Sequence, residues 1–258
     1  MEPELDFIFH PKSIAVVGAS PNPRHGNDFY KFLLEYPFKG TLYPVNPNVR
    51  DINGTHVYPS VEDIPGPVDY VISAVGSPRV LELVDQCARK GVKVIHFYTA
   101  RMRETGTEEG IKLEEDLLRK VKAAGIRIIG PNCMGIYYPG EGMTFKSSFP
   151  SDQGIVSVLS QSGGNIGQMV NLPALRGVRF GKVVSYGNAA DLNECDFMEY
   201  MGEDPETKII SAYIEGVREG KRFFNALRKT AWHKPVIILK GGRTSAGTKA
   251  VASHTASM

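Results

Sequence analysis

The chain alternates between short apolar runs and amphipathic segments, and this alternation restricts its fold more than any other feature. In the first half, runs rich in β-branched residues are separated by segments whose apolar residues recur with helical spacing. Crossovers of this length favour parallel strands and are right-handed by default. We therefore predict an α/β fold that begins with a doubly wound parallel sheet. Its expected strands are 13–17, 40–47, 69–75, 92–98 and 127–130, and its expected helices are 27–36, 78–90 and 107–124.

A second alternation follows a segment rich in Gly, Pro and Ser at 138–152. We place a domain boundary there, which gives domains at 1–148 and 149–258. Residues 235–239 are too few and too β-branched for a buried helix, so we expect an interior strand of a parallel sheet. The other expected strands are 154–160, 182–187 and 208–216, and the expected helices are 161–175 and 196–202.

Composition indicates a soluble globular protein without an obvious polymeric partner. The 258 residues carry a formal net charge of +2 and are 42% hydrophobic, so neither nucleic acid nor an anionic membrane is indicated. The acidic start does not resemble a signal peptide, and no apolar run is long enough to span a bilayer, which predicts a cytoplasmic protein. The three cysteines are far apart, so we expect neither a disulfide framework nor a metal site, and we interpret Cys133 as a packed thiol.

Small or polar residues stand at the tips of the strands expected in the first half. In a parallel sheet these carboxyl ends meet at one edge, where ligands bind. The tips together favour a groove for a phosphate-bearing ligand, although each alone is ordinary strand punctuation. NAD is disfavoured, because only Gly18 of a G-x-G-x-x-G motif is present and no acidic residue ends the second strand. The tip residues are Gly18, Ala19, Ser20, Asn46, Pro47, Val75, Tyr98 and Thr99.

Two further segments have the composition of anion sites. Ser160-Gln-Ser-Gly-Gly164 opens a helix, where N–H groups of Gly163 and Gly164, the hydroxyls of Ser160 and Ser162, and the helix dipole can converge on an oxyanion. The alternative is an N-cap followed by flexible glycines, and both interpretations stay open. The turn 131–135 could add an anion contact through Asn132.

The last segment presents a histidine among small residues. His254 follows the strand expected at 235–239 and a glycine-rich loop, a placement that suits a general base or nucleophile. Glu215 ends another expected strand at the same edge, where its carboxylate could orient the imidazole. The alternatives are a solvated loop histidine and a solvated strand-end charge.

Taken in order, these segments resemble the α-type half of NDP-forming acyl-CoA synthetases, which include the ADP-forming acetyl-CoA synthetases and are relatives of succinyl-CoA synthetase. The resemblance covers essentially the whole chain, and the ordered series is far more specific than any one motif. The motifs are Val16-Val-Gly-Ala-Ser20, Tyr43-Pro-Val-Asn-Pro47, Tyr58-Pro-Ser-Val-Glu-Asp-Ile-Pro65, Gly130-Pro-Asn-Cys-Met-Gly135, Ser160-Gln-Ser-Gly-Gly164, Ser185-Tyr-Gly-Asn-Ala-Ala-Asp191, Lys240-Gly-Gly-Arg-Thr-Ser-Ala-Gly247 and Ser253-His-Thr255.

The resemblance implies a Rossmann-like CoA-binding domain followed by a flavodoxin-like ligase domain. It implies the reversible conversion of a carboxylic acid, CoA and ATP to acyl-CoA, ADP and phosphate. His254 would carry the phosphoryl group, Glu215 would steady it, and the helix that begins at Gln161 would hold the phosphohistidine or phosphate. The strand tips of the first half would bind CoA.

Three departures qualify this resemblance. The chain ends four residues after His254 and has no Walker motif, so we expect it to need an ATP-grasp domain or subunit for ATP and Mg²⁺, in a hetero- or homo-oligomer. Arg101 stands where a Gly-Phe pair is expected near the CoA thiol, and Ala256 replaces a glycine. These departures leave open the alternative of a non-catalytic CoA-sensing regulatory module.

Overall fold

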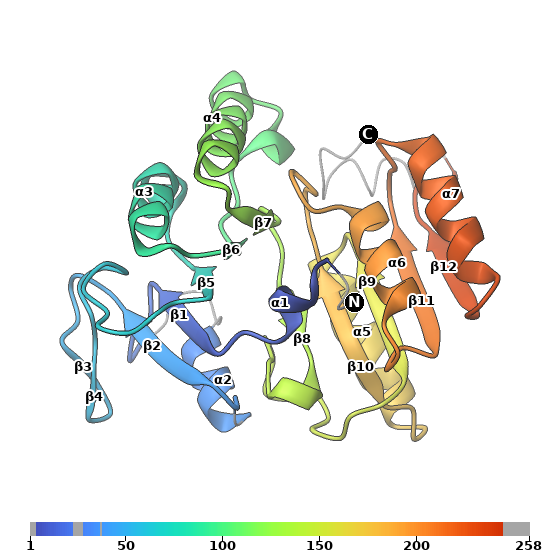
Figure 1. Ribbon diagram of the computed structural model, residues 1–258, viewed down its shortest axis with the longest axis horizontal. Coiled ribbons are helices and arrows are strands. Elements are labelled where there is room, and N and C mark those ends of the chain that lie inside the picture. The colour runs from blue at the N-terminus through green and yellow to red at the C-terminus, as the bar shows by residue number, and fades with distance from the viewer. Residues whose placement is uncertain (1–3, 23–27, 37, 245–258) are drawn as a thin grey trace.

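Two five-stranded sheets stand side by side in the computed structural model, which describes residues 4–22, 28–36 and 38–244 (Figure 1). The first half of the chain forms one sheet and most of the second half forms the other. Within the described residues, no helix is both long and apolar enough to cross a membrane. The α/β fold expected from the alternation is confirmed.

The first sheet is entirely parallel, with the order β2-β1-β5-β6-β7. Ser13 of β1 pairs with Thr41 of β2, and Ile14 pairs with Tyr70 of β5. The chain therefore reverses its direction across the sheet between β1 and β5, which places the switch point at their carboxyl ends. The strands are β1 Ser13–Val17, β2 Thr41–Val45, β5 Tyr70–Ser73, β6 Val94–Phe97 and β7 Arg127–Ile129.

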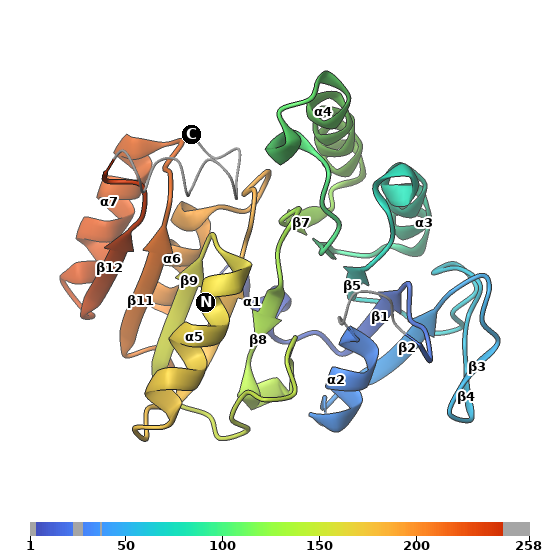
Figure 2. The same cartoon turned by 180° about the vertical axis from the view of Figure 1, so that it is seen from behind.

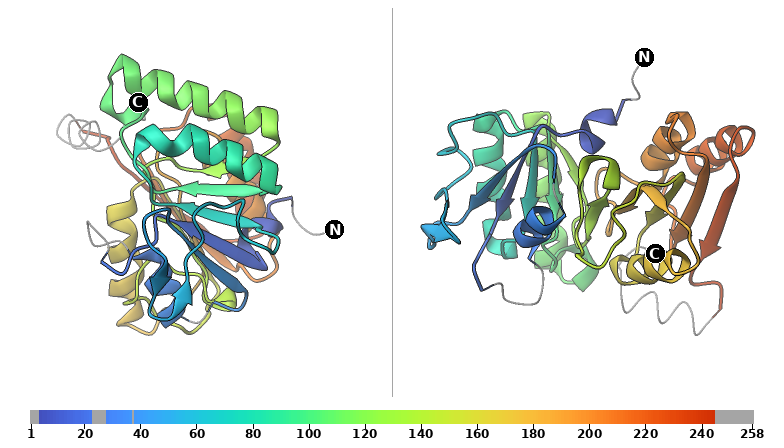
Figure 3. Two further views of the ribbon diagram at one scale, coloured as in Figure 1. Left: turned by 90° about the vertical axis from the view of Figure 1, so that its left-hand side faces the viewer. Right: turned by 90° about the horizontal axis from the view of Figure 1, so that it is seen from below.

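Helices cover both faces of the first sheet. Helix α2 (Phe29–Glu35) lies on one face, whereas α3 (Val80–Lys90) and α4 (Glu108–Ala124) lie on the other (Figures 1 and 3). Strand β1 is buried on both sides for this reason: Ile14 and Val16 belong to one apolar core, and the alternating residues Ala15 and Val17 belong to the other. The three helices expected in this half are confirmed.

The sequence patterns did not predict the small elements around this sheet. Helix α1 (Asp6–Phe9) precedes it, and the hairpin of β3 (Asp51–Ile52) and β4 (Thr55–His56) lies between β2 and β5. These elements are too short for periodicity to reveal them. Single 3₁₀ turns occur at Ser77–Arg79, Arg103–Thr105 and Pro139–Glu141.

The second sheet has the order β12-β11-β9-β10-β8. Strands β9 (Val156–Ser160), β10 (Phe180–Ser185), β11 (Ile209–Ile214) and β12 (Val236–Lys240) are parallel, and β8 (Gly135–Tyr137) is antiparallel to β10. Helix α5 (Gly163–Ala174) covers one face, and α6 (Glu194–Glu203) packs beside α7 (Gly220–Ala231) on the other (Figures 1 and 2). This order repeats the β2-β1-β5 reversal in β10-β9-β11.

The expectation of an interior strand at 235–239 was wrong. Within the described residues β12 pairs with β11 alone, so it is an edge strand, and Ile237 and Leu239 are 62% and 60% exposed. An apolar, β-branched run indicates burial on both faces but does not reveal how many neighbours a strand has. The boundary expected after residue 148 stays a prediction, and the chain already enters the second sheet at β8. Helix α7 was not predicted.

The two halves share an apolar core and a polar seam. Ile14 and Phe29 of the first half belong to the same core as Val158 and Ile210 of the second. Along the seam, the Asn188 N–H donates to Pro131 O at 3.0 Å, and Ala190 N–H donates to Gly130 O at 3.0 Å. Arg127 forms an ion pair with Asp191 at 3.0 Å. The relative position of the two carboxyl edges is therefore held by the backbone itself.

Candidate functional site

A cleft of about 830 Å³ opens at the carboxyl ends of β1, β2 and β5. Four of the predicted strand-tip residues line it, namely Gly18, Asn46, Pro47 and Val75. The cleft coincides with the switch point of the sheet, the usual ligand position in this architecture. Its size suits a ligand much larger than a single phosphate.

The other four predicted tip residues do not line the cleft but lie around it. Ala19 is buried and its carbonyl accepts a 2.8 Å hydrogen bond from Asn46 Nδ2, whereas the Ser20 hydroxyl accepts from Asn22 N–H at 3.2 Å. Thr99 donates through Oγ1 to Val75 O at 2.7 Å, and the Tyr98 ring meets Phe29 edge to face. Three of these side chains thus contact neighbouring structure, and Ala19 and Thr99 bond directly to lining residues.

The sequence interpretation missed a second wall of the cleft. Arg79, Glu82 and Gln86 line it from the start of α3, and Ser60 lines it from the connection after β4. Residues 79, 82 and 86 recur at about one helical turn and follow the strand tip at Val75. That polar helical stripe directly after a predicted tip was the signal that could have revealed them.

The second candidate region is the turn that leads from β9 into α5. The buried Ser160 donates through Oγ to Ser162 O at 2.8 Å, and Ser162 Oγ accepts from Asn165 N–H at 3.4 Å as the N-cap of α5. The N-cap interpretation is confirmed, and the anion site stays a prediction. Within the described residues Gly164 has nothing within 4 Å of the position a Cβ would take, so space remains above this helix start.

The turn at residues 130–135 packs between two glycines of the second half. A Cβ on Gly163 would lie 2.8 Å from Met134 Cγ, and a Cβ on Gly187, whose φ is +54°, would lie 2.3 Å from Pro131 O. Only glycine permits both approaches. Asn132 donates from its backbone to Thr99 O at 2.9 Å and from Nδ2 to Asn188 Oδ1 at 3.4 Å. The predicted residue Asn132 therefore lies at the junction of the two edges.

Glu215 lies directly after β11 and is 4% exposed. The Gln161 side chain ties its position to β9, because Gln161 Oε1 accepts hydrogen bonds from the N–H groups of Glu215 and Gly216, the latter at 2.9 Å. Burial raises the pKa of Tyr213, and the nearby Glu215 carboxylate raises it further. Two predicted site elements, Glu215 and the 160–164 turn, are thus brought together at adjacent strand ends.

Two further sequence interpretations, on Cys133 and Arg101, can be located. Cys133 is buried, and burial raises the pKa of its thiol, as expected of a packed cysteine. Arg101 is exposed with φ of +71°. His254 lies outside the described residues. Among those residues, no group of three or more His, Cys, Asp or Glu side chains is arranged to hold a metal ion.

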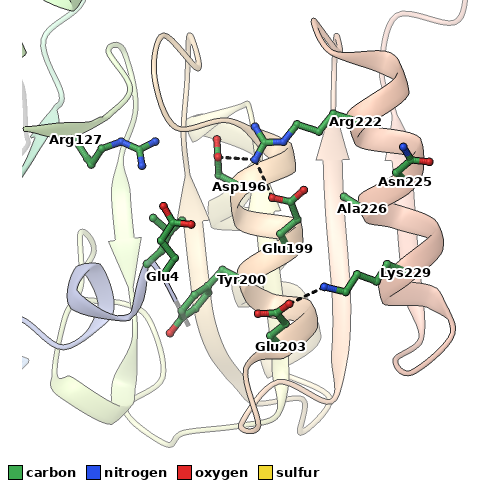
Figure 4. Close-up of a pocket in the computed structure, with 11 residues that line it drawn as sticks. Glu4, Arg127, Asp196, Glu199, Tyr200, Glu203, Arg222, Asn225, Ala226 and Lys229 are labelled. Carbon is green, nitrogen blue, oxygen red and sulfur yellow. Dashed lines mark hydrogen bonds and ion pairs between the residues drawn. The ribbon is translucent and has the colours of Figure 1, made fainter. Parts of the chain in front are cut away.

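A separate hollow of about 320 Å³ lies between α6 and α7, away from the strand tips (Figure 4). Arg222 bonds there to Asp196 and to Glu199 at 2.8 Å each, and Lys229 bonds to Glu203 at 2.7 Å. Because these cations already have carboxylate partners, the hollow offers less to a charged ligand than the cleft does.

Comparisons with known proteins match both halves of the chain. Residues 12–139 match the family described as CoA binding domain, and residues 153–258 match the succinyl-CoA ligase like flavodoxin domain. The alpha subunit of acetate–CoA ligase [ADP-forming] II from Pyrococcus furiosus is 40% identical over 98% of this chain and 55% of its own length. The alpha 2 subunit of succinate–CoA ligase [ADP-forming] from Archaeoglobus fulgidus is 31% identical over 76% of this chain and 67% of its own.

The chain belongs to the NDP-forming acyl-CoA synthetase family. A solved structure agrees: the dinucleotide forming acetyl-coenzyme A synthetase 1 of Ca. Korarchaeum cryptofilum, in complex with phosphate and ADP, superposes with a TM-score of 0.89 at 36% identity. That match covers 99% of this chain and 55% of the other. The chain spans between 36% and 56% of the length of the first four curated relatives of this synthetase family.

Proposed function

We propose that this chain is the CoA-binding and phosphohistidine part of an ADP-forming acyl-CoA synthetase. The observation that carries this proposal is the pairing of a large cleft at one switch point with a helix-start turn and a buried carboxylate at the other. Family membership and the names of the relatives support the reaction. An ATP-grasp domain or subunit would supply ATP and Mg²⁺, as the match to part of each longer relative suggests.

The chemistry proceeds in three transfers. ATP phosphorylates a ring nitrogen of His254 and leaves as ADP. A carboxylate oxygen of the acid then attacks this phosphorus, which breaks the P–N bond and forms an acyl phosphate. The CoA thiol, losing its proton, attacks the acyl carbon, and phosphate leaves with the C–O electron pair. Formation of the acyl phosphate turns the poor leaving group of the carboxylate into a good one.

The described residues suit distinct roles in this scheme. The cleft at Gly18, Asn46, Pro47 and Val75 would hold CoA, with Ala19, Ser20, Tyr98 and Thr99 beside it. The α5 start at Ser162, Gly163 and Gly164, with Ser160 and Asn132, would hold the phosphoryl group or phosphate, since helix N-termini favour anions. Glu215 would orient His254 through one ring nitrogen and leave the other for phosphoryl transfer.

The test is ATP-dependent acyl-CoA formation by the complete synthetase, with acetate as the first acid. We expect the unaltered enzyme to release ADP, phosphate and acetyl-CoA in equal amounts. His254→Asn should abolish turnover while CoA binding persists. Full activity of His254→Asn would exclude the phosphohistidine route, and CoA binding without turnover by the unaltered complete enzyme would favour the CoA-sensing module instead.

A further inference from the structure

One cation faces the cleft at the first switch point. Among the described residues that line this cleft, Arg79 is the only one with a positively charged side chain. Arg79 is exposed, and its side chain forms no ion pair within the described part of the chain. Its backbone is fixed, because its N–H donates to Gly76 O at 3.0 Å in the 3₁₀ turn that precedes α3. The guanidinium is therefore free to meet an anion.

The opposite wall of the cleft is arranged unlike that of an NAD site. In dinucleotide-binding sheets, an acidic residue after the second strand holds the ribose hydroxyls, whereas an arginine accommodates a ribose phosphate. Here Asn46 directly follows β2, and both ends of its amide are engaged, Nδ2 with Ala19 O at 2.8 Å and Oδ1 with Asn48 N–H at 2.9 Å. The tip of β2 thus places no carboxylate that would repel a ribose phosphate.

The proposal rests on the proposed function, in which this cleft binds CoA. CoA differs from dephospho-CoA only by a phosphate on the ribose of its adenosine, and NAD lacks this phosphate too. We propose that Arg79 binds this ribose phosphate and that this contact makes the cleft select CoA over dephospho-CoA. A guanidinium suits the role, because its fork of N–H donors matches two phosphate oxygens at once. Glu82, one turn further along α3, lines the same wall and weakens the attraction.

The experiment compares four proteins by calorimetric titration with CoA, dephospho-CoA and NAD. These are the unaltered protein, Arg79→Gln, Arg79→Lys and the control Arg119→Gln. Arg119 is also an exposed arginine but lies on α4 beside Asp116, so its substitution removes an equal charge away from the cleft. Because the Arg79 side chain has no partner among the described residues, its substitution should not disturb folding, and melting curves check this directly.

We expect Arg79→Gln to weaken CoA binding roughly 10- to 100-fold, as for other hydrogen bonds to charged groups, and to leave dephospho-CoA binding unchanged. The CoA affinity of Arg79→Lys should lie between those of the unaltered protein and Arg79→Gln. The CoA affinity of Arg119→Gln should equal that of the unaltered protein. Equal weakening of CoA and dephospho-CoA by Arg79→Gln, or no weakening of either, would overturn the role of Arg79 while the cleft remained a CoA site. Failure of the unaltered protein to bind CoA would instead refute the proposed function, and with it this inference.

Discussion

The same strand reversal occurs twice in this chain, and its two carboxyl edges differ in openness. The first, at β2-β1-β5, opens onto a cleft of about 830 Å³. At the second, β10-β9-β11, Ser160, Gln161 and Glu215 are buried, and the 130–135 turn packs against Gly163 and Gly187. The same local reversal therefore provides room for a large ligand in one half and an enclosed, preorganised turn in the other.

The difference shows that a switch point alone does not determine what binds there. Asn46, Pro47 and Arg79 line a wide space at the open edge, whereas backbone bonds from the other half close the second edge. Thr99 connects the two, since its hydroxyl donates to Val75 O at the cleft and its carbonyl accepts from Asn132 N–H in the packed turn. Substitutions at the packed edge and along the seam should therefore reveal how far this closure stabilises the fold.

Gly187→Ala should have the largest effect on stability. The new Cβ would meet Pro131 O at 2.3 Å in a backbone with φ of +54°, so we expect a loss of about 4 kcal/mol in the free energy of unfolding, measured by urea denaturation. Gly177→Ala is the matched control: its φ is +84°, but no atom of the described residues lies within 4 Å of the added Cβ, so it should lose about 1 kcal/mol. Equal losses in the two variants would mean that the turn is not tightly packed.

Acid should weaken the packed edge through His96. His96 is fully buried beneath Gly135 and bonds through Nε2 to Cys133 O at 3.1 Å, and burial lowers its pKa to about 4. The unfolded chain takes up this proton near pH 6.5, so between pH 6.5 and 4 it binds more protons than the folded chain, and stability falls as pH falls. We expect His96 to lower the free energy of unfolding by about 3 kcal/mol over this pH range.

His96→Gln isolates that contribution, because glutamine can keep a hydrogen bond but does not titrate. Denaturation measured from pH 7 down to pH 4 should show a smaller loss of stability in this variant, while carboxylates contribute equally to both proteins. Parallel stability curves would show that His96 does not couple this edge to pH.

Asn188→Ala should loosen the seam between the halves. The Asn188 amide donates to Glu104 Oε2 at 2.6 Å and to Glu114 Oε2 at 3.2 Å, and its loss leaves the buried Glu114 with Arg103 as its charged partner. We expect a loss of about 2 kcal/mol. Asn171→Ala, whose amide reaches Ser148 Oγ at 3.5 Å near the surface, should change stability by less than about 0.5 kcal/mol. A comparable change in both would argue against a specific role for the seam.

Ser162→Ala should have the smallest effect on stability. Compared with the equivalent cap variant in the first half, it should differ in phosphate binding. Ser162 caps α5 as Thr107 caps α4, so either alanine variant should lose about 1 kcal/mol. Only Ser162→Ala should also weaken phosphate binding, measured by calorimetry. Equal phosphate affinity in the two variants would remove Ser162 from the proposed anion site.

Sequence patterns predicted the regular elements well, because burial of one face imposes a regular spacing of apolar residues on strands and helices. The β1, β5 and β6 runs and the helices α3 and α4, which end at Lys90 and Ala124 as expected, all lie where local chemistry indicated. Pattern failed where neighbours decide the outcome. An edge strand such as β12 and the antiparallel β8 carry the same apolar residues as interior strands, and pairing depends on contacts distant in sequence.

The candidate site shows the same division. Strand tips predicted the position of the cleft, and half of the chosen residues line it. Arg79, Glu82 and Gln86, however, come from the 3₁₀ turn and the helix that follow β5. Their contribution depends on which face of α3 turns toward the sheet edge. The meeting of Gln161 with Glu215 likewise results from the β9–β11 pairing, which the sequence of either strand alone does not reveal.

The most direct test of the central claim is the detection of phosphate on His254. The complete synthetase, given ATP and Mg²⁺ without acid or CoA, should form an acid-labile, alkali-stable phosphoryl group, which mass spectrometry under alkaline conditions would place on His254. Acetate and CoA added afterwards should discharge it with formation of acetyl-CoA. Acetyl-CoA formation by an enzyme whose His254 never carries phosphate, or undiminished turnover by His254→Asn, would contradict the account.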